Sequence, residues 1–151
     1  KDLFIMSRGS VGKALEIQHN NGLEIFDKLI ELLFFSKEIS KEKIWELLSM
    51  QNSFENSKDY HKFIINMLLS AITHISISMI DEKKSFLNNY NNNKNRKLYE
   101  KNYSDFYFPY TLIYSMVLED FNNALKVNLN LEYILFTIFI KIEKIKKSFK
   151  L

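Results

Sequence analysis

The sequence contains no cysteine, one proline and only three glycines among 151 residues. Without cysteine there is no disulfide framework, thiolate zinc site or cysteine nucleophile, and the composition fits a reducing cytoplasm. Because glycine and proline interrupt regular structure, their scarcity predicts long helices. Hydrophobic residues make up 46% and charged residues 26%, the balance of an ordinary globular domain rather than a disordered tail or a membrane protein.

Apolar residues recur at intervals of three and four, the spacing of one buried helix face. No segment alternates with period two, and nothing repeats at a fixed interval. The sequence therefore predicts an all-α, antiparallel helical bundle of about five to six helices. The expected helices cover 10–17, 23–35, a segment after Ser40, 59–81, 109–127 and a segment after Asn130.

Three details of this pattern can be checked directly. Helix 59–81 keeps its apolar period longest and is expected at the centre of the bundle. Residues 83–102 lose the period and predict a mobile loop. Pro109 is expected to begin the next helix, because the first turn of a helix has no N–H partner to lose.

The segment from Ser7 to Ala14 looks at first sight like a phosphate-binding P-loop. That motif needs glycine five positions before its Gly-Lys pair and a serine or threonine after the lysine. Those two positions are Ser7 and Ala14. We therefore do not expect nucleotide binding through this loop.

Other catalytic patterns are also missing from the sequence. The histidines His19, His61 and His74 lack H-E-x-x-H spacing and have no cysteine partners, so no metal site is expected. No G-x-S-x-G nucleophile elbow occurs, and Glu119-Asp120 has the pattern of solvated helix charge. We expect no catalysis, no cofactor and no small-molecule substrate.

A net charge of +3 is too small to indicate nucleic-acid binding by itself. Lysine and arginine do gather in a basic loop, residues 83–101, and in a C-terminal tail from Lys141 to Lys150. Both clusters are typical of solvated charge near helix ends. The alternative is a helical DNA-binding module that uses the basic loop and the C-terminal tail to contact phosphates.

Aromatic residues concentrate between positions 106 and 110. Phe106, Phe108 and Tyr110 are candidates for a protein interface, because aromatic side chains bury large areas. Packing in the core is the stronger alternative. Stacking on single-stranded bases is weaker, since no basic residue is interleaved with the rings.

The segment from Ser7 to Glu16 is similar to the G-S-x-[GR]-x-A-L motif in the helical lid of clamp-loader AAA+ subunits. The matching residues are Gly9, Ser10, Gly12, Ala14 and Leu15. In the ATP-hydrolysing subunits, the position two residues after the serine usually holds a sensor arginine. Glycine at this position resembles the delta-prime branch of the bacterial DNA polymerase III clamp-loader family, the stator that does not turn over ATP.

The order of the later segments carries the same resemblance, including Asn128-Leu129-Asn130-Leu131 before the final helix. It implies that residues 1–20 end an AAA+ lid and that residues 21–151 form a collar domain of a longer protein. The implied role is non-catalytic assembly, with the delta and ATPase subunits as partners, during DNA replication in the bacterial cytoplasm. DNA would be reached only through the complex, and no membrane is implied.

Overall fold

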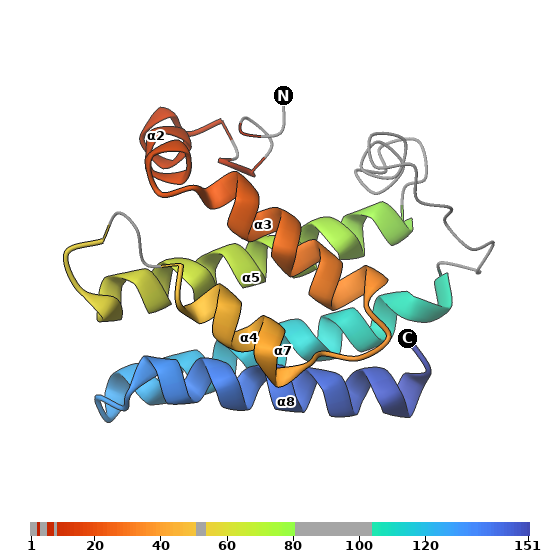
Figure 1. Ribbon diagram of the computed structural model, residues 1–151. Helices are drawn as coiled ribbons and strands as arrows, with labels where there is room; N and C mark the ends of the chain where they lie inside the picture. The colour runs from red at the N-terminus through yellow and green to blue at the C-terminus, as the bar shows by residue number, and fades with distance from the viewer. Residues whose placement is uncertain (1–2, 4–5, 8, 51–53, 81–103) are drawn as a thin grey trace.

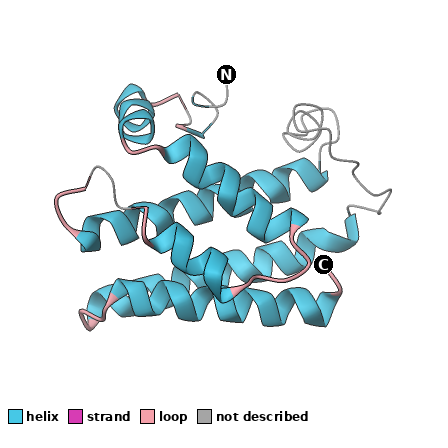
Figure 2. Ribbon diagram, in the orientation of Figure 1, coloured by secondary structure: helices cyan, strands magenta, loops and turns pink. Residues whose placement is uncertain are grey.

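The computed structural model describes residues 3, 6–7, 9–50, 54–80 and 104–151, with only the backbone for 104–106. The regular structure of this described part is entirely helical, as Figure 2 shows. Its elements are α2 (Val11–His19), α3 (Gly22–Ile30), the π-helical turn η1 (Glu31–Phe35), α4 (Lys41–Leu48), α5 (Ser57–Ile80), α7 (Ser104–Lys126) and α8 (Leu131–Phe149). The predicted all-α fold is confirmed.

The long helices α5, α7 and α8 run along a common direction, and α3 and α4 lie across one side of them (Figure 1). The Lys58 ammonium donates to Asn128 Oδ1 at 2.9 Å, which joins the start of α5 to the turn after α7. These two helices are therefore antiparallel, and α7 and α8 are antiparallel through the same short turn. Helix α2 packs on α3 at the N-terminal edge of the bundle.

Helix α5 is the central helix, as its long apolar period predicts. It buries twelve residues and packs against α3, α7 and α8. Within the described chain it is also the one helix long and apolar enough to cross a membrane by length and composition. More than half of its most apolar stretch is covered by neighbouring helices, as is usual for the core helix of a globular domain.

Polar side chains cap three helices where they begin. Ser10 Oγ accepts from the Lys13 N–H and Ser40 Oγ accepts from the Lys43 N–H. Asn130 Oδ1 accepts from the backbone of Glu132 and of Tyr133 at the start of α8. Each cap satisfies a donor that a free helix N-terminus leaves unpaired.

The expected start of the fifth helix at Pro109 is wrong. Helix α7 begins at Ser104, so Pro109 lies inside its second turn. Proline has no N–H, so α7 lacks one backbone hydrogen bond at this position. Because the position is close to the start of the helix, the first turns persist without it. The predicted loop at 83–102 lies outside the described residues.

Two apolar residues that the spacing assigns to buried faces are exposed. Leu23 lies at the start of α3 and Leu125 near the end of α7, each more than 40% exposed. Both directly follow a buried residue, Gly22 and Ala124, so each helix is packed at this point and the leucine lies on another side of it. The spacing therefore assigned these two residues to the wrong face.

Candidate interaction surfaces

The motif from Gly9 to Leu15 forms a turn and the first part of α2. Gly9 has φ 77°, in the left-handed region that glycine adopts without strain, and Ser10 follows as the helix cap. A Cβ built on Gly12 would meet no atom within 4 Å. Ala14 is half-buried, whereas Leu15 is 61% exposed. The helix therefore presents an open glycine and an exposed leucine where the resemblance places the lid.

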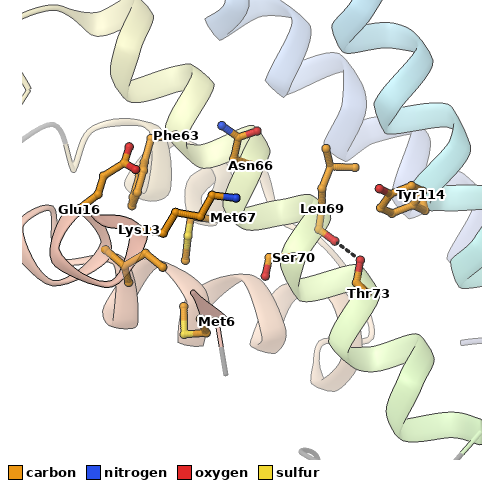
Figure 3. A pocket seen from close by; sticks show the side chains of 11 residues that line it. Met6, Lys13, Glu16, Phe63, Asn66, Met67, Leu69, Ser70, Thr73 and Tyr114 are labelled. Carbon is orange, nitrogen blue, oxygen red and sulfur yellow. Dashed lines mark hydrogen bonds between the residues drawn. The ribbon is translucent and has the colours of Figure 1, made fainter. Parts of the chain in front are cut away.

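A cavity of about 260 Å³ lies between α2, α5 and α7, as Figure 3 shows. Its apolar lining comes from buried or partly buried side chains, namely Met6, Ile17, Phe63, Met67 and Leu69. Its polar lining comes from all three helices, namely Lys13, Glu16, Asn66, Ser70, Thr73 and Tyr114. The cavity thus combines an apolar floor with a polar and charged rim.

Lys13 belongs to this cavity. Its side chain extends from α2 toward α5, and Tyr114 lies on the far side of the space on α7 (Figure 3). In a P-loop the corresponding lysine reaches the phosphates held at the helix N-terminus. The placement of Lys13 gives this lysine a different environment, formed by α5 side chains.

Most polar groups around the cavity have no partner within the described residues. Thr73 Oγ1 donates to the Leu69 carbonyl at 2.8 Å. The Lys13 ammonium, the Glu16 carboxylate and the Ser70 hydroxyl make no hydrogen bond or ion pair with any other described residue. Among the described residues, nothing occupies the hydrogen-bonding atoms of these three groups.

The aromatic segment 106–110 divides between surface and core. Phe108 is 65% exposed, and its ring lies 6.1 Å from that of Phe149 at the end of α8. Tyr110 is buried and donates its hydroxyl to the Leu33 carbonyl at 2.7 Å. The side chain of Phe106 lies outside the described part. Of these three candidates, Phe108 reaches the surface and Tyr110 packs in the core.

The C-terminal lysines are largely engaged by the fold. The Lys141 ammonium contacts both carboxylate oxygens of Asp120, at 2.9 and 2.7 Å. Lys147 pairs with Glu143 at 2.8 Å. A DNA backbone would have to compete with these carboxylates. The basic loop 83–101 lies outside the described residues.

The lysines of the C-terminal tail were expected to be exposed to solvent, but the side chain of Lys146 is only 1% exposed. Its ammonium donates to the Leu32 carbonyl at 3.1 Å and to the Ser36 carbonyl at 2.6 Å. These carbonyls lie at the end of η1, where helical carbonyls lack partners within the helix. Burial lowers the pKa of Lys146 to about 8, opposed by the nearby Glu143 carboxylate.

Neither the burial of Lys146 nor the cavity was predicted from the sequence. A signal existed for Lys146, since it follows Ile142 by four residues on the buried stripe of α8. The cavity had no comparable signal. Its lining comes from three helices that are distant in the sequence, and helical spacing alone does not predict a gap between them.

No family model, curated protein or solved structure matches this chain. Among the described residues, no three His, Asp or Glu side chains are grouped so that they could hold a metal ion.

Proposed function

We propose that this chain is the C-terminal part of a delta-prime-type subunit of the bacterial DNA polymerase III clamp loader. Its role is non-catalytic: it joins the delta and ATPase subunits during assembly of the loader. The observation that carries the proposal is the segment from Gly9 to Leu15. Its sequence resembles the clamp-loader lid motif, and it forms a serine-capped helix with Gly12 at the place that corresponds to the motif's sensor residue.

The surroundings of Gly12 support this reading. A sensor residue acts through a long cationic side chain that reaches phosphate. Gly12 has no side chain, and the space around it is open. A Cβ atom would therefore fit there without contact, so the glycine is not required by close packing at this position. A subunit that does not use ATP has no need of the arginine.

Exposed apolar side chains support an assembly role. Val11 and Leu15 on α2, Phe108 on α7 and Tyr133 on α8 are each more than 60% exposed. Scattered exposed apolar residues are ordinary. Here they accompany a cavity with an apolar floor, most of whose polar groups have no partner within the described residues, a combination typical of surfaces that bind other proteins.

The test is a binding assay between this chain and the separately purified delta and ATPase subunits from the same genome, at about 150 mM salt. We expect a stable complex with at least one subunit, seen by co-elution in size-exclusion chromatography. Absence of binding to every subunit, singly and together, contradicts the proposal.

The same assay separates this proposal from the DNA-binding alternative. A DNA-binding module would hold duplex or single-stranded DNA with an affinity that falls steeply as salt rises, because bound lysines release counterions. We expect binding to subunits with a weaker salt dependence than DNA binding would show, since a contact of this kind would be mainly apolar. Lys141, Lys146 and Lys147 are already engaged within the fold, which favours the assembly proposal.

A further inference from the structure

Helix α7 has a second packing face next to the cavity. Tyr107, Thr111, Tyr114, Leu118, Phe121 and Leu125 recur at alternating intervals of four and three, the spacing of core positions in a coiled coil. The helix already packs against α5 and α8, and a different set is buried, namely Tyr110, Ile113, Val117 and Ala124. Tyr107, Leu118 and Leu125 are exposed, whereas Tyr114 and Phe121 are partly buried against the edge of the core, and Tyr114 also lines the cavity. The second face therefore has the pattern of a helix that receives another helix.

The size of the cavity indicates what enters it. Pockets for drug-sized ligands span about 300–1,000 Å³. At about 260 Å³ this cavity is smaller and suits one large side chain. Its floor of Phe63 and Met67 is apolar, and methionine adapts to the shape of what it contacts. A buried anchor side chain in such a pocket commonly supplies much of the energy of a protein interface.

The rim adds a requirement on charge. Lys13 and Glu16 lie three residues apart on α2, one turn of the same helix. Neither has an ion-pair partner within the described chain. Covering both without partners would be unfavourable, because a buried charge needs an opposite charge or hydrogen bonds. A matching partner presents an acid toward Lys13 and a cation toward Glu16, about one helical turn apart.

We propose that the cavity between α2, α5 and α7 receives an amphipathic helix of another clamp-loader subunit. That helix inserts one aromatic or long aliphatic side chain over Phe63 and Met67. It also places a carboxylate against Lys13 and lies along the second face of α7. The identity of the partner rests on the proposed function, whereas the chemistry of the partner helix rests on the cavity and its rim.

The first test fills the cavity from within. Ser70→Leu introduces an apolar side chain that occupies the space and favours the helix. Ser115→Leu is the matched control: it makes the same change on α7, at an exposed position outside the cavity lining. We expect Ser70→Leu to weaken binding to the partner subunit at least about tenfold and the control to leave it within about twofold. Thermal melting of each variant verifies the fold.

The second test reverses the rim charge. Lys13→Glu should weaken binding by about three- to tenfold, chiefly through slower association at low salt. Lys144→Glu makes the same change at an exposed position on α8 and should have little effect. A charge-reversed partner helix, with lysine in place of its acid, should restore binding to Lys13→Glu.

The outcomes separate the two proposals. If the wild-type chain binds a subunit and Ser70→Leu binds equally well, this inference is overturned while the proposed function stands. If the wild-type chain binds no subunit, the proposed function is wrong, and so is the identification of the partner as a clamp-loader subunit. If the chain alone forms a dimer that Ser70→Leu abolishes, the occupant is a second copy and the inference is wrong.

Discussion

The η1 end of the fold and the cavity beside α2 differ in how they use their polar side chains. At the η1 end, Lys146 donates to two carbonyls and Tyr110 donates to a third, all three within residues 32–36. At the cavity, Lys13, Glu16 and Ser70 line an open space without partners in the described chain. Both regions contain a lysine and a tyrosine.

The difference separates groups that stabilise the fold from groups that we propose to contact a partner. Buried polar atoms almost always have hydrogen bonds, because leaving one unpaired costs about 1–3 kcal/mol. Lys146 and Tyr110 meet this requirement by binding the carbonyls that η1 leaves free. Solvent can reach the polar groups around the cavity, so they do not need a hydrogen-bond partner within the protein. Substitutions in the two regions should therefore affect different measurements.

The largest expected effect is at the η1 end. Lys146→Ala removes the buried methylenes and leaves the Leu32 and Ser36 carbonyls without their donor. We expect the free energy of unfolding to fall by about 3 kcal/mol, measured by urea denaturation. Lys144→Ala, an exposed lysine on the same helix, should change it by less than about 0.5 kcal/mol. Equal effects of the two substitutions would show that the contacts of Lys146 add no stability.

The next largest effect is expected where α2 packs against α3. A Cβ on Gly22 would lie 2.7 Å from Ile17 Cγ2 and 2.8 Å from the Ile17 carbonyl oxygen. The neighbour includes backbone, so α2 itself must move. Gly22→Ala should therefore destabilise the protein by about 2 kcal/mol in thermal or urea unfolding. Because Ile17 also lines the cavity, binding to the partner subunit should weaken as well.

If Gly22→Ala unfolds the protein at the same temperature as the wild type, the close approach of α2 and α3 is not rigid. In that case α2 would be free to shift, and the cavity would not have one fixed shape.

A smaller effect should appear with pH at the η1 end. The pKa of Lys146 is about 8 in the folded chain, below the ordinary 10.5 of the unfolded chain. Above pH 8 the unfolded chain therefore binds more protons than the folded one, and stability rises with pH in this window. We expect a gain on the order of 1 kcal/mol between pH 8 and pH 9.5, measured by urea unfolding.

The rise of stability with pH does not continue at higher pH. Burial raises the pKa of Tyr60 and Tyr110 above the ordinary 10.0, so ionisation of these tyrosines favours unfolding at higher pH. Lys146→Met, which keeps the length but not the titrating group, should lose the rise between pH 8 and pH 9.5. A rise that persists in this variant would have to come from another group.

Most of the fold could be predicted from the sequence, because its helices are long and strongly periodic. The core of α5 and the break before α8 followed from the spacing of apolar residues and from the short polar segment at Asn128-Leu129-Asn130. The start of α7 did not, because a proline near the beginning of a helix is compatible with more than one starting residue.

The candidate sites were harder to predict because they depend on contacts between distant segments. Lys146 was grouped with the exposed lysines of the tail, although it is 110 residues from the Ser36 carbonyl that it binds. Phe108 and Tyr110 are two residues apart and looked equivalent, yet successive helix positions point about 100° apart. The tyrosine therefore faces the core while Phe108 is exposed.

The smallest expected effect is that of a substitution at Gly12, on α2. A methyl group at this position meets no atom within 4 Å, and α2 is already helical there. Gly12→Ala should therefore raise the free energy of unfolding by about 0.5 kcal/mol, since alanine loses less backbone entropy than glycine.

The effect of Gly12→Ala on partner binding is more informative than its effect on the free energy of unfolding. Gly12 does not line the cavity, so the affinity for the partner subunit should stay unchanged, in contrast to Gly22→Ala. Gly12→Arg introduces the residue that the motif it resembles usually has in ATP-hydrolysing subunits, and we expect it to be tolerated because a Cβ atom at this position meets no neighbour. If either substitution lowers stability or abolishes partner binding, then the glycine is required by this chain's own structure or interface. It could then no longer be explained by the loss of a nucleotide sensor.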